Sequence, residues 1–475
     1  MIGPRQLADC LGSLLCNGDP PAEAAPFNDI VIDSRKVTPG SLFVALRGEQ
    51  TDGHRFLADA VERGATGLLT RVQPPDLPAS VAVFLVEDTL HALQQAAKRW
   101  RTAQSARVIG ITGSVGKTTT REAVAAVLRS RYETLESPRN FNSDIGLPLA
   151  LLGLSPSHEW AVIEMGPYDR QEMELLVEVG APDMGIVTNV GPTHLERFGS
   201  IEATEQIKGL LPASLPPEGV AFLNGDDERV RRMRARTAAR TLLFGRGDDV
   251  DVRATDVVSH GLDGIAFSLH LPDATGPIAV RTPLAGAHHA MTALAAAAVG
   301  HVAGLSPVET AEALSRLHAG SRLTPRRAYS GATILDDTYN AAPLSMRAAL
   351  DLLAGMQGHR IAVLGDMLEL GQEEVAAHRA VGEYAVGRCQ RLIAIGRRAR
   401  GITDGAWDAG HREIQWFADK AEATELLRNE LGADDVVLVK ASHGLALETV
   451  VAALITPPGP AQRPAPAAAS EERAP

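Results

Sequence analysis

Short apolar runs recur along this chain, and helix-like stretches separate many of them. The earliest runs are residues 30–35 and 42–46, with a turn at Pro39 and Gly40 between them and a helical pattern over residues 54–63 after them. Apolar runs bounded by turn residues predict strands, and apolar positions three to four residues apart predict helices. We therefore expect a small α/β domain over residues 1–104.

Two longer alternations of apolar runs follow. The first has runs at residues 108–112, 161–163, 185–188, 220–223 and 242–244, and the second at 332–335, 361–364, 392–395 and 436–439. Strands that alternate with helices predict largely parallel, doubly wound sheets, and ligands bind beyond the carboxyl ends of such strands. The predicted fold is therefore α/β with three domains, the second over residues 105–322 and the third, Rossmann-like, over residues 323–456.

Two stretches that contain proline lie at the edges of the third domain. Residues 322–327 contain three arginines and Pro325, and we interpret them as the boundary and hinge. Residues 457–475 are rich in proline and alanine and too poor in other apolar residues to build a core, so we expect a disordered tail.

Charge and cysteine content exclude several classes of protein. The 475 residues include 46 Lys and Arg against 58 Asp and Glu, a net charge of −12, which argues against a nucleic-acid binder. Three cysteines are too few and too scattered for a disulfide framework or a zinc site. The chain opens without an apolar signal core, and no stretch approaches the roughly 18 apolar residues of a membrane span. We therefore expect a soluble cytoplasmic protein without membrane insertion.

A glycine-rich segment at residues 110–120 follows an apolar run and opens a helical one. Such a strand-to-helix loop turns backbone N–H groups toward a di- or triphosphate, while a lysine neutralises charge and a threonine hydroxyl reaches Mg²⁺. The alternative is a glycine-rich turn that binds nothing. The nucleotide-binding interpretation assigns ATP contacts to Gly113, Ser114, Val115, Gly116, Lys117, Thr118 and Thr119.

Two further polar residues follow apolar runs of the central alternation. Glu164 ends a predicted strand, so its carboxylate should emerge at the same sheet edge as the phosphate loop, a suitable place for Mg²⁺. A glutamate solvated in the following loop is the alternative. His194 lies in a loop after the next run and is either a metal ligand or a surface or structural histidine.

Several motifs together carry a resemblance that covers nearly the whole chain. They are residues 33–35 with 39–54, 110–122, 140–148, Glu164, 188–194, 286–288, 336–340 and 365–371. In combination they resemble the Mur ligase family, and the pair at residues 336–340 and 365–371 resembles the branch of it that adds D-alanyl-D-alanine. The first domain resembles the uridine-nucleotide-binding domain of these ligases.

The resemblance implies ATP-dependent amide formation on a cytoplasmic precursor of peptidoglycan. UDP-N-acetylmuramoyl-tripeptide would be activated as an acyl phosphate and then attacked by the amine of D-alanyl-D-alanine, with release of ADP and phosphate. Lys117, Glu164, His194 and Lys208 would be the catalytic residues. Two Mg²⁺ ions are implied, held by Thr118, Glu164, His194 and Lys208, the last carbamylated in several family members. We expect a monomer.

The remaining expected roles also follow from the resemblance. ATP would contact His289, Arg322 and Asp337; the UDP substrate would contact Ser34, Arg35 and Asn142; the dipeptide would contact Tyr339, Asn340 and Asp366. The chain departs from the family pattern at Leu210, His289, Thr292, Ala342 and His443.

Three alternatives remain open at this point. A sister ligase that adds the third amino acid commonly carries Asp-Asn-Pro-Arg, which does not occur in this sequence. A catalytically weak paralogue that only binds UDP-sugar peptides would explain the departures, but it leaves the intact Lys117, Thr118, Glu164 and His194 without a reason. A simple P-loop kinase leaves the first and third domains unexplained.

Overall fold

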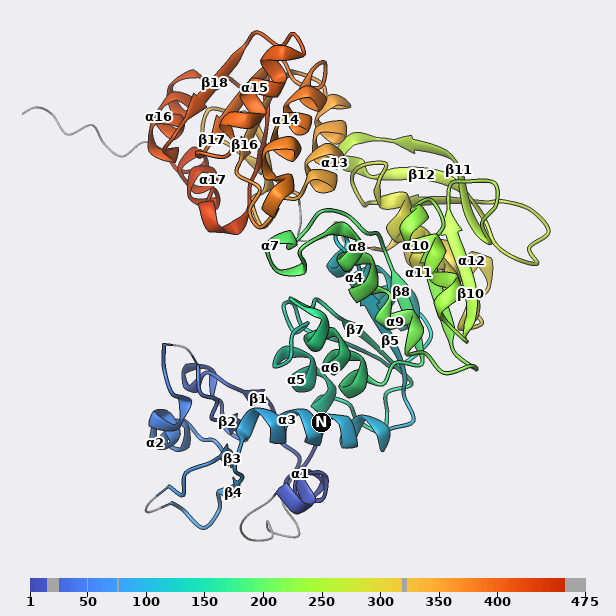
Figure 1. The fold of residues 1–475 in the computed structure, drawn as a ribbon, viewed down its shortest axis with the longest axis vertical. Coiled ribbons are helices and arrows are strands. Elements are labelled where there is room, and N and C mark those ends of the chain that lie inside the picture. The colour runs from blue at the N-terminus through green and yellow to red at the C-terminus, as the bar shows by residue number, and fades with distance from the viewer. Residues whose placement is uncertain (15–24, 49, 75–76, 318–322, 458–475) are drawn as a thin grey trace, which may run out of the picture.

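The computed structural model of the chain describes residues 1–14, 25–48, 50–74, 77–317 and 323–457. Three sheets follow one another along the sequence, and each is built from one stretch of chain. In Figure 1 the first region lies at the bottom, the third at the top, and the central region between them. Among the helices of the described residues, none combines the length and the apolar character that crossing a membrane requires.

The first region contains a four-stranded parallel sheet in the order β1-β2-β3-β4. Two of its strands are shorter than the apolar runs that predicted them. Residues 34–36 form a turn after β1, and Ala45 is buried in the loop after β2. Asp88 caps the last helix by accepting a hydrogen bond from the backbone N–H of His91 at 2.9 Å. The elements are α1 (Pro4–Leu11), β1 (Ile30–Val31), β2 (Leu42–Val44), α2 (Leu57–Glu62), β3 (Gly67–Thr70), β4 (Ala82–Leu85) and α3 (Thr89–Thr102).

The central region contains a nine-stranded sheet in the order β13-β12-β11-β10-β9-β8-β5-β7-β6. It is parallel from β6 to β11, and the antiparallel strands β12 and β13 extend one edge. The strands are β5 (Arg107–Thr112), β6 (Thr134–Glu136), β7 (Trp160–Glu164), β8 (Met184–Val187), β9 (Val220–Asn224), β10 (Arg240–Gly245), β11 (Val252–Ser259), β12 (Ile265–His270) and β13 (Ile278–Thr282). The helices are α4 (Lys117–Arg129), α5 (Gly146–Leu152), α6 (Arg170–Gly180), α7 (Leu195–Phe198), α8 (Ile201–Lys208), α9 (Leu210–Ala213), α10 (Glu228–Arg232), α11 (His289–Val302) and α12 (Pro307–Ser315).

The third region contains a six-stranded sheet in the order β14-β15-β19-β16-β17-β18, parallel except for β14. Two separate clusters of buried apolar side chains form its cores, as a doubly wound sheet requires. Its elements are β14 (Thr324–Arg327), β15 (Thr333–Asp337), α13 (Pro343–Ala354), β16 (His359–Gly365), α14 (Glu374–Ala385), β17 (Arg391–Ile395), α15 (Arg400–Asp408), β18 (Ile414–Phe417), α16 (Lys420–Glu430), β19 (Asp435–Lys440) and α17 (Glu448–Ile455).

The predicted fold class is confirmed, because all three sheets are mainly parallel and helices connect most of their strands. The hairpin strands β11, β12 and β13 were not predicted. In β12 buried and partly exposed residues alternate, so the strand lacks the continuous apolar run by which the other strands were identified. The division at residues 104 and 322 stays a proposal, and Arg322 and residues 458–475 lie outside the described residues.

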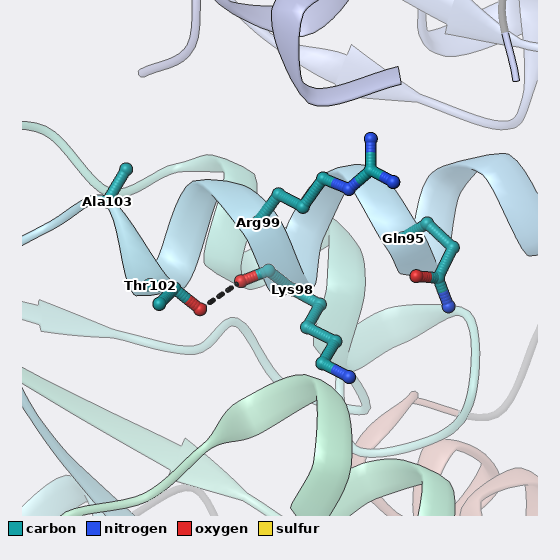
Figure 2. A pocket seen from close by; sticks show the side chains of 5 residues that line it. All are labelled: Gln95, Lys98, Arg99, Thr102 and Ala103. Carbon is teal, nitrogen blue, oxygen red and sulfur yellow. Dashed lines mark hydrogen bonds between the residues drawn. The ribbon is translucent and has the colours of Figure 1, made fainter. Parts of the chain in front are cut away.

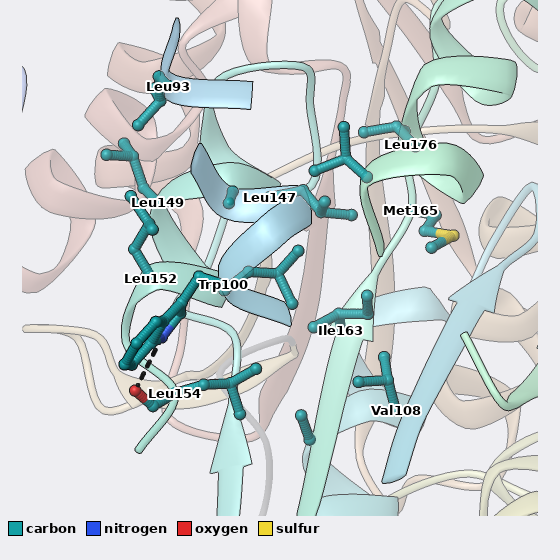
Figure 3. Packing of buried hydrophobic residues seen from close by; sticks show 14 of the residues in the cluster. Leu93, Trp100, Val108, Leu147, Leu149, Leu152, Leu154, Ile163, Met165 and Leu176 are labelled. Carbon is teal, nitrogen blue, oxygen red and sulfur yellow. Dashed lines mark hydrogen bonds between the residues drawn. The ribbon is translucent and has the colours of Figure 1, made fainter. Parts of the chain in front are cut away.

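Helix α3 joins the first region to the central one through a shared apolar core. Trp100 of α3 packs among leucines of α5 and the loop after it, and its indole N–H donates to the carbonyl of Leu154 at 3.1 Å (Figure 3). The Gln94 amide donates to the carbonyl of Asp144 at 3.1 Å, and Arg101 pairs with Asp183 at 2.7 Å. One buried cluster therefore extends through both regions.

Candidate functional site

The glycine-rich loop lies where β5 ends and α4 begins, at the carboxyl edge of the central sheet. Gly113 has φ 149°, and a Cβ there would lie 1.9 Å from the hydroxyl of Thr188. Gly116 has φ 84°, in the left-handed region that side chains disfavour. Both glycines are therefore required for the curve that points the N-terminus of α4 at a ligand.

A second loop, after β8, holds the phosphate loop in shape. The side-chain amide oxygen of Asn189 accepts from the N–H of Val115 at 2.9 Å, and the Thr188 hydroxyl donates to the Val115 carbonyl at 2.8 Å. The Ser114 hydroxyl donates to the Gly191 carbonyl at 3.0 Å. These bonds within the protein hold the loop in its curved shape.

Lys117 is the first residue of α4, and its ammonium donates to the carbonyl of Gly113 at 2.9 Å. This contact folds the lysine back over the loop. A phosphate bound at the N-terminus of α4 would meet the ammonium and the positive end of the helix dipole together.

Glu164 is the last residue of β7 and is only 3% exposed. It lies opposite Ile111 in the register between β5 and β7, so its side chain emerges beside the phosphate loop. Its Oε2 accepts from the Thr118 hydroxyl at 2.9 Å, and its Oε1 accepts from the Asn142 amide at 2.9 Å. The carboxylate is thus held by two elements and is not solvated in a loop.

Arg121 also reaches this carboxylate, and the sequence did not single it out. Its guanidinium nitrogen lies 3.7 Å from Glu164 Oε2, and its side chain is 3% exposed. The signal that could have found it is its spacing, because a residue three positions after Thr118 shares the same face of α4.

His194 directly precedes α7, in the loop that follows β8, and has φ 55°. Its Nδ1 donates to the carboxylate of Glu369 in the third region, and its ring packs against Tyr168 and Phe198 at 5.8 and 6.0 Å between ring centres. Burial lowers the pKa of His194 below its ordinary value, although the hydrogen bond to Glu369 acts in the opposite direction.

Lys208 ends α8 and is 2% exposed, not an exposed helix lysine. Its amine lies 5.7 Å from the centre of the Phe198 ring, and no carboxylate pairs with it among the residues that the structure describes. Burial, with the charge of Lys117 adding to it, holds the pKa of the Lys208 amine well below its ordinary value.

The donors around Glu164 fit a hard cation. Magnesium prefers oxygen ligands and completes its shell with water and substrate phosphates, and Thr118 and Glu164 supply oxygens within one hydrogen bond of each other. The hydroxyl of Thr193 is buried without a hydrogen-bond partner within the described ranges. Over those same ranges no three His, Cys, Asp or Glu side chains gather to hold a metal, so such a cation would also need oxygens from the nucleotide.

The residues expected at the adenine and the hinge lie in two regions. His289 Nδ1 lies 3.3 Å from the Thr292 hydroxyl, and its ring centre is 4.1 Å from that of His288. Asp337, at the end of β15, pairs with the buried Lys440 at 2.6 Å. Arg322 lies outside the described residues.

The three residues expected to bind the dipeptide differ in their surroundings. Tyr339 is 48% exposed and donates its hydroxyl across to the side chain of Asn140 in the central region at 2.6 Å. Asn340 accepts from the N–H of Ala341 at 2.8 Å. Asp366 is 8% exposed and accepts from the N–H of Ala399 at 2.7 Å, a contact at the start of α15.

Ser34 and Arg35 lie apart from the residues above, in a turn after β1 of the first sheet. Ser34 is buried, whereas Arg35 is exposed and forms two hydrogen bonds with Asp33 at 2.9 and 2.8 Å. These bonds lower the pKa of Asp33 to about 2. The structure therefore brings together the residues expected at the phosphates and the metal. Asn142, expected to contact the UDP substrate, lies with them at Glu164, whereas Ser34 and Arg35 lie apart.

A hollow of about 480 Å³ on α3 shares no residue with this site. Figure 2 shows its lining of Gln95, Lys98, Arg99, Thr102 and Ala103. Its two cations are engaged elsewhere, since Lys98 pairs with Glu178 at 2.7 Å and Arg99 donates to the carbonyl of Cys10 at 2.8 Å.

Three family models match the chain in sequence. They are the Mur ligase family, catalytic domain, at residues 26–101, the Mur ligase middle domain at 111–300, and the Mur ligase, glutamate ligase domain at 321–443. The UDP-N-acetylmuramoyl-tripeptide–D-alanyl-D-alanine ligase of Bacillus subtilis is 34% identical over 96% of this chain and 98% of its own.

Solved structures agree with these matches. The MurF of Acinetobacter baumannii superposes with a TM-score of 0.84 at 29% identity, covering 96% of this chain and 98% of its own. The MurF ligase of Thermotoga maritima, solved in complex with ADP, superposes with a TM-score of 0.77 at 26% identity, covering 90% and 96%.

Proposed function

The chain belongs to the Mur ligase family, and from this premise we propose that it joins D-alanyl-D-alanine to UDP-N-acetylmuramoyl-tripeptide with hydrolysis of ATP to ADP and phosphate. The observation that carries the proposal is the contact between Thr118, beside the phosphate loop, and the buried carboxylate of Glu164. A phosphate-binding helix terminus and a hard-metal donor set then meet at one sheet edge.

The chemistry follows from the poor reactivity of a carboxylate. The terminal carboxylate of the tripeptide attacks the γ-phosphoryl group of ATP, which gives an acyl phosphate and ADP. The amine of D-alanyl-D-alanine attacks the acyl carbon, loses a proton, and expels phosphate as the amide forms. Phosphoryl transfer mainly requires alignment and charge neutralisation, and Lys117 with the N-terminus of α4 would supply both at the phosphates.

Magnesium would be held by Thr118 and Glu164, with His194 and Lys208 as ligands of a second ion. The ion supplies positive charge at the phosphate oxygens when it is bound. Asn142 orients Glu164, and Tyr168 and Phe198 orient the His194 ring. Because the bond to Glu369 occupies Nδ1 of His194, Nε2 is the ring nitrogen that would serve as the ligand.

Lys208 is proposed to be carbamylated. Burial lowers the pKa of the Lys208 amine and so favours the neutral form, which is the form that reacts with CO₂. The resulting carbamate would offer oxygen ligands in place of a cation. The absence of a carboxylate partner to Lys208 in the described part of the chain favours this modification. An exposed lysine would give no such reason.

We assign the other substrates to the remaining residues as part of the same proposal. Ser34 and Arg35 bind the uridine nucleotide; His289, Arg322 and Asp337 bind ATP; Tyr339, Asn340 and Asp366 bind the dipeptide. The enzyme would act as a monomer in the cytoplasm, where its nucleotide-linked substrate is made.

The test is an assay of purified protein with ATP, Mg²⁺, UDP-N-acetylmuramoyl-tripeptide and D-alanyl-D-alanine. Phosphate release and the mass of a pentapeptide product are expected, and both should disappear in Lys117→Ala. Phosphate release no higher than in Lys117→Ala would refute the ligase and favour the binding paralogue. Release with a free amino acid and UDP-N-acetylmuramoyl-dipeptide, but not with D-alanyl-D-alanine, would identify the sister ligase.

A further inference from the structure

Arg121 is a buried cation placed behind the carboxylate that faces the phosphate loop. Its side chain is 3% exposed, and that of Glu164 is 4% exposed. A buried arginine costs free energy unless its charge and its donors are satisfied. The groups that satisfy the charge and the donors of Arg121 therefore indicate its role.

Two contacts from outside the phosphate loop fix the guanidinium. Its Nε donates to Glu136 of β6 at 3.1 Å, and a terminal nitrogen donates to the carbonyl of Pro138 at 3.3 Å. Glu122 lies 3.6 Å away on the same helix. Arg121 would thus keep its place even if Glu164 moved.

The contact between Arg121 and Glu164 is not a hydrogen bond like those to Glu136 and Pro138. At 3.7 Å it is a charge interaction at Oε2, the same oxygen that accepts from the Thr118 hydroxyl, while Oε1 is taken by Asn142. The arginine therefore balances the buried negative charge and limits the directions in which Oε2 can turn.

We propose that Arg121 is a positioning residue, which holds the Glu164 carboxylate in place and charge-balanced for a nucleotide-bound divalent cation. This inference rests on the proposed function, in which Glu164 is a ligand of that cation. Groups behind a metal ligand orient it, and their loss commonly weakens metal affinity.

Arg129 provides a matched control on the same helix. It also pairs with Glu136, at 2.7 Å, but its side chain is 48% exposed, and no contact joins it to Glu164 among the described residues. Arg129→Met and Arg121→Met therefore remove the same group from the same acidic partner, and only the second change reaches Glu164.

The experiment is calorimetric titration of the full chain with ADP, once with Mg²⁺ and once with EDTA. In Arg121→Met the dissociation constant of ADP with Mg²⁺ should rise about 10- to 100-fold, while that in EDTA stays within about twofold. Arg129→Met should leave both constants within about twofold. Arg121→Lys keeps the charge and should recover most of the Mg²⁺-dependent affinity.

Equal weakening of ADP with and without Mg²⁺ would overturn the inference, because a structural role predicts it. An unchanged Mg²⁺ effect in Arg121→Met would overturn it as well. If circular dichroism shows that Arg121→Met does not fold, Glu136→Gln takes its place. That change loosens the arginine and should selectively weaken Mg²⁺-ADP, and no selective loss would refute the proposal.

The two proposals fail separately in this design. A wild-type chain that forms no pentapeptide but shows the selective Mg²⁺ loss in Arg121→Met would refute the ligase and keep the positioning role. A wild-type chain that forms the pentapeptide while Arg121→Met binds Mg²⁺-ADP normally would do the reverse.

Discussion

The central region has two neighbours, and it is joined to them in different ways. With the first region it shares a buried apolar cluster that includes Leu93 and Trp100 of α3 together with Leu147 and Ile163 (Figure 3). The buried members of the third region's two clusters all lie between residues 328 and 454. The third region therefore has cores of its own.

The central and third regions meet through both polar bonds and apolar contacts, among them Leu262, which packs against a cluster of the third region. Tyr339 bonds to Asn140, His194 bonds to Glu369, and Leu344 lies against Gly191. An interface that contains polar bonds permits relative motion more readily than a shared apolar core does. We therefore expect the first and central regions to behave as one fixed unit and the third region to move when substrates bind.

Trp100→Ala should have the largest effect. The change removes a large buried side chain and leaves the Leu154 carbonyl without its donor, so we expect a loss of about 3–5 kcal/mol in the free energy of unfolding. Hydrogen exchange resolved by mass spectrometry should rise both in β1–β4 and around α5 and β7, since the two regions share this core.

Leu350→Ala is the control for that experiment. Leu350 is fully buried in α13 and belongs only to the core of the third region, so its loss should raise exchange there alone. Faster exchange confined to the first region in Trp100→Ala would mean that the first and central regions have separate cores. That result would contradict a fixed attachment between them.

Arg101→Met should have the next largest effect. Arg101 is 6% exposed and binds the carbonyls of Gly180 and Ala181 as well as Asp183. Because half-exposed Asp183 can rehydrate, we expect a loss of about 1–3 kcal/mol, measured by urea unfolding. Lys98→Met, which removes an exposed pair with Glu178 from the same helix, should cost less than about 1 kcal/mol. Equal losses would show that burial of Arg101 adds nothing to this interface.

A buried histidine should make the stability of the third region depend on pH. His378 is 1% exposed; its Nε2 accepts from the N–H of Met367 at 3.0 Å and its Nδ1 donates to the Glu374 carbonyl at 2.7 Å. Burial lowers the pKa of His378 from the ordinary 6.5, so the unfolded chain takes up the proton first. The stability it contributes is complete above pH 6.5 and is lost as the pH falls toward the lowered value.

The measurement is the urea midpoint of the third region between about pH 7.5 and 5.5, the range in which an ordinary histidine titrates. The midpoint should fall with pH in the wild-type chain, and this part of the decline should be absent in His378→Gln. The same pH dependence in both proteins would contradict the assignment.

Glu369→Ala should have the smallest effect on stability. It removes the bond to His194, and because both side chains are partly exposed we expect a change below about 1 kcal/mol. Exchange in residues 194–199 should nevertheless rise, since the Glu369 side chain is one of their links to the third region, beside the pair of Glu196 with Arg398. The control is Glu373→Ala. Glu373 lies in the turn Gly371–Glu373 that follows Glu369, and it makes no contact with His194 in the described chain. Unaltered exchange would mean that other contacts hold the third region in place.

Residues whose position follows from local pattern could be predicted from the sequence. Glu164 ends an uninterrupted apolar run beside the run that enters the phosphate loop, and parallel strands bring such ends to one edge. The roles assigned to the site residues stay predictions.

Features that depend on packing between distant segments could not be predicted. Lys208 reads as an ordinary helix lysine, and its burial arises because Phe198 and the rest of its surroundings fold over it. The role of Arg121 could not be predicted for the same reason, since its partners Glu136 and Glu164 come from two strands, β6 and β7. The attachment of α3 to the central core is likewise set by tertiary contacts that no local pattern records.

Helix α3 makes the distance from the turn at Ser34 to the loop at Gly113 a fixed length, because it belongs to the core of both regions. On the proposed function, a nucleotide-linked peptide anchored at its uridine end must bring its own carboxylate to the phosphates. We therefore expect the fixed unit to select peptides by their contour length, because only a peptide of the right length brings its carboxylate to the phosphates. Changes to α3 that alter its length would alter the peptide that the enzyme accepts.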